Sequence, residues 1–197
     1  FFGIGDRQEG DPAQDITVPQ GKIHRIHDDG RVPRDNPFFS TAGAYKSIWT
    51  YGNRNPQGLD MHPLTGDIWE TEHGPRGGDE INLIRPGINY GWPVITYGMN
   101  YDGTPWTDKT HMEGMEQPVY YWLPSIATGG IDFYEGDAFP GWKYNLLATG
   151  MSAEEIQRIV IQDKRVVHVE TILKKQGRVR DVATGPDGLI YVALNTR

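Results

Sequence analysis

The stretch SIWTYGNRNPQGLDMHPLTGDIWETEHGPRGGDEINLIRPGINYGWPVITY, residues 47–97, indicates most clearly how this chain folds. Its apolar runs are short and end at glycine and proline turns, a pattern typical of β-strands of about five residues. Two intervening segments, Asn53–Gly58 and Glu72–Glu80, combine rigid turn residues with guanidinium, amide, imidazole and carboxylate groups. We therefore expect short strands with two polar loops at the rim of a site.

Outside this stretch, two strand patterns repeat along the chain. In the first, a strand of alternating apolar residues is followed by a polar turn, and in the second, two apolar strands flank a turn. Such repeats indicate small antiparallel sheets joined in series. The first pattern covers Lys22–Ile26, Ile81–Ile84 and Ile156–Ile161, and the second covers Gly58–Thr71, Gly130–Ala148 and Asp181–Val192.

These repeats predict an all-β fold, a β-propeller of about four blades, in a single, incomplete domain over residues 1–197. The spacing is near the roughly 40–50 residues of one blade when loop insertions such as Asn100–Gln117 are allowed for. An open β-sandwich is the alternative. Because Phe1 falls within an expected strand, we expect further blades upstream. Ser152 and Glu155 have capping-box spacing, which predicts at most one helical turn.

Composition narrows the classes of partner. The 197 residues include 19 Lys and Arg against 26 Asp and Glu, a net charge of −7 with no basic block, so we expect no nucleic acid partner. No run approaches the roughly 20 apolar residues of a membrane span. The chain has no cysteine, which excludes disulfides and thiolate chemistry.

The first chemical constellation is Arg54, Asn55 and Gln57, placed around Pro56. Proline restricts its own backbone and that of the preceding residue, so these side chains are presented on a stiff loop. A planar cation beside two amides suits a planar, oxygen-rich ligand. The alternative is that the amides hydrogen-bond the backbone of neighbouring turns.

The second constellation is the segment Glu72–Glu80. The carbonyl groups of Gly74 and Pro75 and the carboxylates that follow Gly77 and Gly78 are hard oxygen donors of the kind that calcium prefers. Zinc is disfavoured, since His73 has no second histidine or cysteine at ligand spacing. A solvated turn is the alternative interpretation.

The third constellation is Arg178 and Arg180. Side chains at i and i+2 of a regular strand point to one face, so both guanidinium groups could reach the same anion, while Asp181 would face the other way. The alternative is a pair of arginines that meet acids on an adjacent blade.

At these residues the sequence resembles the soluble quinoprotein sugar dehydrogenases, that is, the glucose/sorbosone dehydrogenase family and in particular its aldose sugar dehydrogenase branch. The resemblance covers essentially the whole chain. Several motifs in the right order make it specific. They are GDRQEGDPAQD (5–15), GKIHRI (21–26), DGRVPRDNPF (29–38), GNRNPQGL (52–59), TEHGPRGGDEINLI (71–84), GINYGWPVITYG (87–98) and RVRDVATGPDGLIYV (178–192).

The resemblance implies a six-bladed propeller that holds pyrroloquinoline quinone (PQQ) and calcium at one end of its central channel. It also implies oxidation of an aldose at the anomeric carbon to a lactone, with a histidine as base. An external electron acceptor and a periplasmic or secreted location follow from it, with a homodimer among the possible assemblies.

Site residues follow from the resemblance position by position. Arg54 matches the position beside the reacting carbonyl, which gives it a catalytic role. The main-chain oxygens of Gly74 and Pro75 match an active-site calcium site, and Glu80 with the main-chain oxygen of Tyr90 matches a second, structural one. The positions that match cofactor contacts are Arg54, Asn55, Gln57, His73, Ser125, Arg178 and Arg180.

The chain departs from the family pattern at two places. The position of the catalytic histidine corresponds to a residue upstream of Phe1, and Met151-Ser152-Ala153 stands where many members have a lysine that reaches the cofactor. Three functions are therefore open. They are the cofactor-binding portion of an aldose dehydrogenase, a calcium-dependent propeller lactonase, and a non-catalytic propeller module that binds a sugar or a partner.

Overall fold

The computed structural model describes residues 1–195, which form thirteen strands, two short 3₁₀ turns and long connections. The strands make four separate antiparallel sheets. The first sheet contains β1 (Phe2–Ile4), β2 (Lys22–His24) and β3 (Ile48–Tyr51), and the second contains β4 (Pro56–Met61), β5 (Ile68–Glu72), β6 (Asp79–Ile84) and β7 (Tyr120–Trp122). The third sheet contains β8 (Thr128–Phe133), β9 (Leu146–Gly150), β10 (Glu155–Gln162) and β11 (Arg165–Lys174). The fourth contains β12 (Arg178–Thr184) and β13 (Ile190–Asn195).

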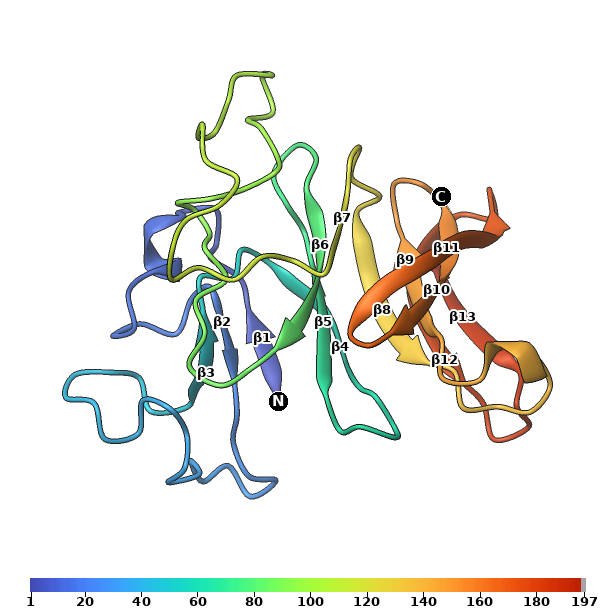
Figure 1. The fold of residues 1–197 in the computed structure, drawn as a ribbon, viewed down its shortest axis with the longest axis horizontal. Helices are drawn as coiled ribbons and strands as arrows, with labels where there is room; N and C mark the ends of the chain where they lie inside the picture. Colours follow the sequence, from blue (N-terminus) through green and yellow to red (C-terminus); the bar gives the residue numbers. More distant parts are fainter. Residues whose placement is uncertain (196–197) are drawn as a thin grey trace.

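The four sheets lie next to one another in sequence order, each a simple meander of adjacent strands (Figure 1). The first strands of neighbouring sheets, β4, β8 and β12, contact one another, so they form the inner edge of the assembly. This is the radial packing of a β-propeller, and two of its blades have four strands. The prediction of an all-β propeller of about four blades is confirmed, and the sandwich alternative is wrong.

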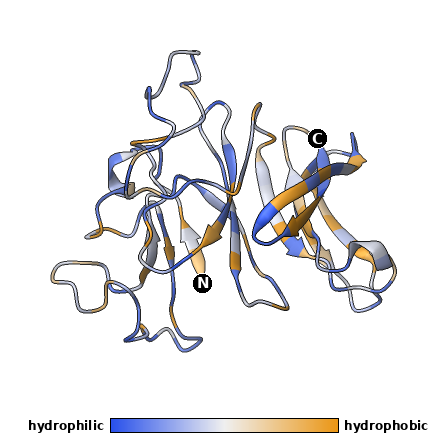
Figure 2. Cartoon of the chain, in the orientation of Figure 1, coloured by the Kyte–Doolittle hydropathy of each residue, from blue (hydrophilic) through white to orange (hydrophobic). Residues whose placement is uncertain are grey.

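Each interface between sheets has its own apolar core. Trp69 and Trp122 pack with Ile131 and Phe133 between the second and third sheets. Smaller clusters, around Ile23 and around Val182, fill the other two interfaces. Figure 2 accordingly shows apolar residues along the strands of all four sheets. Burial of these side chains, at about 25 cal/mol per Å² of apolar surface, holds the blades together.

All six repeated segments contain the expected strands, with differences at their ends. The strand predicted over Lys22–Ile26 ends at His24. Ser152 lies in a turn without a helix, and Glu155 begins β10, so the helical turn that the capping-box spacing allows does not form. The 3₁₀ turns occur instead at Asp11–Ala13 and Pro140–Trp142.

Strand direction brings the polar loops to one end of the molecule. Because neighbouring strands are antiparallel, the starts of β4, β8 and β12 lie at the same end as the β5–β6 turn and the β9–β10 turn. This is the upper end in Figure 1, where residues 98–118 also form a long excursion. The two loops predicted to border a site therefore meet.

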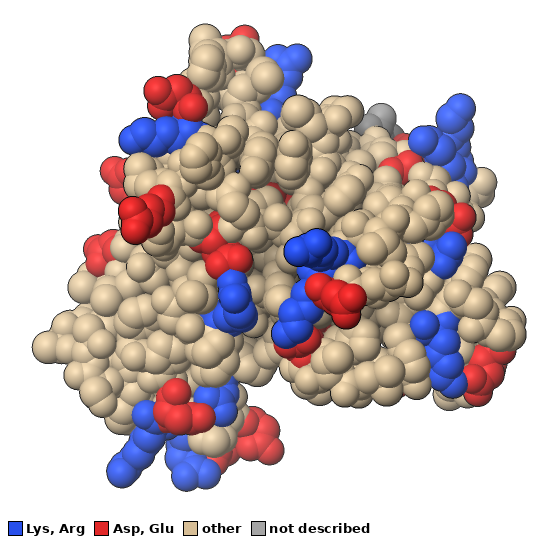
Figure 3. Space-filling model, in the orientation of Figure 1, with Lys and Arg blue, Asp and Glu red and all other residues tan. Residues whose placement is uncertain are grey.

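Surface charge is mixed. On the face shown in Figure 3, Lys and Arg side chains alternate with Asp and Glu, and broad areas have neither. No helix within residues 1–195 is long and apolar enough to cross a membrane.

Candidate functional site

Arg54 precedes β4 and crosses to the β5–β6 turn. Its Nη1 donates to the carbonyl oxygens of His73, at 3.1 Å, and Gly74, at 2.7 Å. Its guanidinium carbon lies 5.1 Å from the centre of the Trp92 ring, a cation–π contact. The Nε of Arg54 is buried and has no hydrogen-bond partner. The side chain is thus fixed in place, and its Nε–H could still donate to an anionic or carbonyl oxygen.

Glu72 fixes the backbone of the same loop. Its Oε2 accepts hydrogen bonds from the backbone N–H groups of Arg54, at 2.5 Å, and Asn55, at 3.2 Å. Gln57, in contrast, is exposed at an irregularity in the β4–β5 pairing, and its amide donates to the Pro56 carbonyl at 3.2 Å. The predicted constellation is therefore divided, since Arg54 and Asn55 face the β5–β6 turn and Gln57 faces solvent.

His73 is a rigid part of the wall. Its Nε2 lies 2.6 Å from the carbonyl oxygen of Thr128, which can only accept, so Nε2 carries the proton. Nδ1 then accepts from the side-chain amide of Asn55, at 3.3 Å. Burial lowers the pKa of His73, so the ring is held neutral. With both nitrogens engaged, His73 has no free atom with which to act as a base.

Asp79 organises the loops around the site. Its Oδ1 accepts from the backbone N–H of Gly74, at 3.0 Å, and from the hydroxyl of Ser125, at 2.7 Å, while its Oδ2 accepts from the Thr128 N–H at 3.2 Å. Gly74 sits so close to the carbonyl groups of the same turn that a Cβ there would collide with them. The turn can form only with glycine at this position and a buried acceptor beneath it.

Together these loops enclose a cavity of about 280 Å³ at the upper end of the second and third sheets. It is bordered by the main chain of the predicted calcium-binding step and by the Ser125 side chain. Its lining includes His73, Gly74, Pro75, Arg76, Asp79, Tyr101 and Ser125.

The two predicted clamp arginines begin β12. Arg178 is close enough to His73 for its charge to contribute to the lowered pKa of that ring. The pairing of β12 with β13 is irregular between Val179 and Asp181, so the strand is not regular at Arg180, which is exposed. Alternation on a regular strand therefore no longer supports a shared face for the two arginines with Asp181 on the other face. Their convergence on one anion remains a prediction from the resemblance.

Three carboxylates lie below the loops: Glu70 and Glu72, which are buried, and Glu80, which is half-buried. Across the β5–β6 pair, Glu70 is opposite Asn82 and Glu72 is opposite Glu80. The side-chain nitrogen of Asn82 lies 3.2, 3.2 and 3.3 Å from oxygens of Glu70, Glu72 and Glu80, respectively. An amide NH₂ has only two hydrogens, so it cannot satisfy three carboxylates. Burial, with repulsion between the carboxylates, raises the pKa of Glu70 and Glu80 well above normal, and burial raises that of Glu72 to about 7.

This cluster has the donor chemistry of a calcium site. Oε1 of Glu70 and Oδ1 of Asn82 are buried without partners. Glu72, Glu80 and Tyr90 border a void of about 10 Å³ beside the cluster. Within residues 1–195, no group of three or more His, Cys, Asp or Glu side chains is arranged to hold a metal ion, and the carboxylates of this cluster are hydrogen-bonded by the Asn82 amide. The oxygen donors at Glu80 and Tyr90 fit a hard cation, whereas the Gly74 carbonyl is already bonded to Arg54.

The residues of the chain identify its family. The family model described as glucose/sorbosone dehydrogenase matches residues 1–197. The chain belongs to the glucose/sorbosone dehydrogenase family. Aldose sugar dehydrogenase YliI of Escherichia coli (strain K12) is 44% identical over 195 residues, which are 98% of this chain and 53% of that protein. The branch predicted from the motifs is thus confirmed.

Solved structures agree with this family assignment. A crystal structure of glucose dehydrogenase matches with a TM-score of 0.94 and 42% identity, over 97% of this chain and 56% of that one. The PQQ-bound form of aldose sugar dehydrogenase from Streptomyces coelicolor matches with a TM-score of 0.74 and 28% identity, over 96% and 50% of the two chains. The chain spans about half the length of these relatives.

Sequence reasoning missed the buried polar groups of this glucose/sorbosone dehydrogenase family member. The sequence does not distinguish Asp79, Glu72 and Glu70 from exposed acids, although all three are almost fully buried. One signal was present, because Glu70 and Glu72 are spaced i, i+2 in a strand that is rich in apolar neighbours. The cross-strand register that joins them to Glu80 cannot be read from spacing alone.

The carboxylate cluster predicts how stability depends on pH and calcium. An acid whose folded-state pKa is raised stabilises the fold fully below its unfolded pKa, and this contribution is lost as pH rises through the folded pKa. For Glu72 that interval runs from 4.5 to about 7. At about 1.4 kcal/mol per pKa unit, Glu72 contributes on the order of 3 kcal/mol to the free energy of unfolding. We expect urea unfolding of the chelator-treated chain to show this loss between pH 5 and pH 8, and calcium to reduce it.

Glu70→Gln removes one buried carboxylate and should flatten the pH dependence, whereas Glu113→Gln, at an exposed position, is the matched control. An equal pH dependence in all three proteins, with and without calcium, would contradict the assignment of this cluster as a cation site.

Proposed function

We propose that this chain is the cofactor-binding portion of a PQQ-dependent aldose dehydrogenase, which oxidises the anomeric carbon of an aldose to a lactone. The observation that supports it most directly is the cavity that His73, Gly74 and Ser125 line, whose His73 and Gly74 carbonyls are held by Arg54. Family membership and the PQQ-bound relative favour the same chemistry.

Each residue of the site would have a distinct role in binding the cofactor. PQQ, when bound, supplies a two-electron acceptor for oxidation of the anomeric carbon. Arg54 would donate to its reacting carbonyl, and Asn55, Gln57, His73 and Ser125 would border its plane. Its carboxylates would be neutralised by Arg178 and Arg180.

Calcium would complete the site at two places. The main-chain oxygens of Gly74 and Pro75 would ligate one ion next to the cofactor, and Glu80 with the main-chain oxygen of Tyr90 would hold a structural one. At the first place the Gly74 carbonyl, which accepts one hydrogen bond from the Nη1 of Arg54, would offer its second lone pair to the ion. The proposal also includes an external electron acceptor and a periplasmic or secreted location.

A titration of the full chain with PQQ at millimolar calcium tests this function. We expect saturable binding of PQQ. Arg54→Ala should weaken binding by about 1.5–3 kcal/mol, the range for a hydrogen bond to a charged group. Arg34→Ala, at an exposed position away from the loops of the site, is the control.

Two other results would overturn the proposal. Hydrolysis of a lactone without any quinone would identify a calcium-dependent lactonase. No quinone binding at all would indicate a non-catalytic module. Because the ring nitrogens of His73 are both engaged, His73→Ala should lower affinity for PQQ and should not act by removing a base.

A further inference from the structure

The N-terminal motif GDRQEGDPAQD, residues 5–15, does not line the cavity of the candidate site. Its 3₁₀ turn, Asp11–Ala13, is fixed to the first sheet by Lys22, which begins β2 and is fully buried. The Lys22 Nζ donates, at 2.6–3.0 Å, to the carbonyl oxygens of Pro12, Ala13 and Gln20. An ammonium group has three hydrogens, so these three acceptors satisfy it completely and hold the turn in place.

Gln14 joins this turn to a distant part of the chain. Its side-chain amide and that of Asn89 form a reciprocal pair, with N···O distances of 3.0 and 2.8 Å. The Gln14 Nε2 also donates to the carbonyl oxygen of Trp92, at 2.6 Å. One side chain thus holds both ends of the segment 89–92.

The backbone of Gly52 lies within the same set of contacts. Its N–H donates to the Ala13 carbonyl at 2.8 Å, and its carbonyl accepts from the Trp92 N–H at 2.9 Å. A Cβ at Gly52, whose φ is +74°, would collide with the side-chain amides of Gln14 and Asn89. These three segments of the chain are therefore packed so closely that a shift of one displaces the others.

Trp92 connects these contacts to Arg54, two residues after Gly52. The Trp92 indole N–H donates to Oδ2 of the buried Asp6 at 2.7 Å, and its ring stacks on Trp106 with centroids 4.6 Å apart. The ring also lies against the Arg54 guanidinium, whose other contacts are the carbonyl groups of the β5–β6 turn. A displacement of Trp92 would therefore alter the position of the guanidinium group.

We propose that Gln14 is a positioning residue of the cofactor site, which holds the Trp92 ring against the Arg54 guanidinium. Gln14 does not line the cavity, so it would act on PQQ only through Trp92 and Arg54. The effect on PQQ affinity rests on the proposed function, whereas the hold of Gln14 on Trp92 does not.

The first test needs no cofactor. In NMR spectra of the full chain, the indole N–H signal of Trp92, assigned with Trp92→Phe, should shift in Gln14→Ala and lose protection from hydrogen exchange about 10-fold. Gln14→Glu keeps the size of the side chain and removes both donors, so it should act in the same way.

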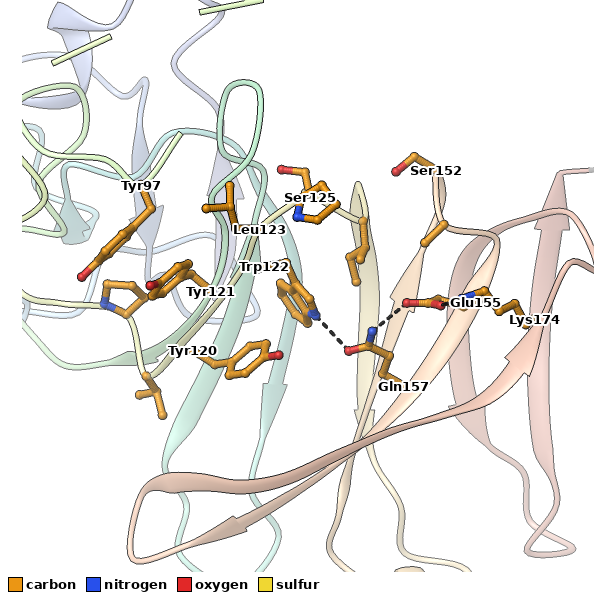
Figure 4. Close-up of a pocket in the computed structure, with 15 residues that line it drawn as sticks. Tyr97, Tyr120, Tyr121, Trp122, Leu123, Ser125, Ser152, Glu155, Gln157 and Lys174 are labelled. Atoms are coloured by element: carbon orange, nitrogen blue, oxygen red, sulfur yellow. Dashed lines mark hydrogen bonds and ion pairs between the residues drawn. The ribbon is translucent and has the colours of Figure 1, made fainter. Parts of the chain in front are cut away.

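Two controls accompany this measurement. The Trp122 indole N–H donates to Gln157 in a separate groove between the second and third sheets, so its signal should not change in either variant (Figure 4). Gln176→Ala removes an exposed amide and should leave the Trp92 signal unchanged. A Trp92 signal that is the same in Gln14→Ala, Gln14→Glu and the unmodified chain would overturn the proposal.

A double-mutant cycle tests whether Gln14 acts through Arg54. At millimolar calcium, Gln14→Ala should weaken PQQ binding about 10-fold in the unmodified chain and much less in the Arg54→Ala background. Equal losses in both backgrounds would indicate a general loss of structure and overturn the positioning role. If the unmodified chain binds no PQQ while the Trp92 signal responds as expected, the hold of Gln14 on Trp92 stands and the cofactor function is refuted.

Discussion

Replacing both Arg178 and Arg180 with alanine is expected to weaken PQQ binding by roughly 3–6 kcal/mol, or about 10²- to 10⁴-fold. Each guanidinium would make a charge-assisted bond to a cofactor carboxylate, and such bonds contribute about 1.5–3 kcal/mol. Titration at millimolar calcium measures the effect. The loss should shrink as salt is raised, because charge pairs near the surface are screened.

A second double substitution of two basic residues, far from the proposed cofactor site, is the matched control. Lys164, in the β10–β11 turn, and Arg165, which begins β11, lie at the opposite end of the sheets. Replacing both with alanine alters the net charge equally and should leave PQQ affinity unchanged. If the two double variants bind PQQ alike, the arginines do not clamp the cofactor. In that case a neutral ligand, as in a lactonase, would agree better with the site.

The strands were predictable because each has a local cause. Alternating apolar residues bounded by glycine and proline define β4, β5, β6, β10 and β12 regardless of what surrounds them. The mutual arrangement of the sheets also followed, because short meanders without crossover helices favour a radial repeat. Neither step required knowledge of the register.

The site was predictable only in part, because its geometry depends on register and on irregular pairing. The bulge at Arg180 and the one at Gln57 arise where one strand has an extra residue, and alternation cannot reveal this. The clustering of Glu70 and Glu72 with Glu80 depends likewise on the β5–β6 register. Motif spacing therefore identified which loops form the site, while the buried hydrogen bonds that shape it came only from the structure.

Asp79→Ala should destabilise the chain by about 3–5 kcal/mol and abolish PQQ binding. The carboxylate is 1% exposed and accepts hydrogen bonds from Gly74, Ser125 and Thr128. Its removal leaves two buried backbone N–H groups without acceptors, each at a cost of about 1–3 kcal/mol. Because the Gly74 turn and the Thr128 backbone also position Arg54 and His73, the cavity should lose its shape along with its stability.

Asp79→Asn separates the two effects. The amide oxygen can still accept from Gly74 N–H and from Ser125, but the amide nitrogen would face the Thr128 N–H, so an intermediate loss of stability is expected. Asp187→Ala is the control, since that exposed carboxylate also accepts a backbone N–H, from Leu189, and its loss should change urea unfolding little. If Asp79→Ala unfolds like the unmodified chain, the loops must be held by other contacts. If it is destabilised yet binds PQQ normally, Asp79 supports the fold without shaping the cofactor site.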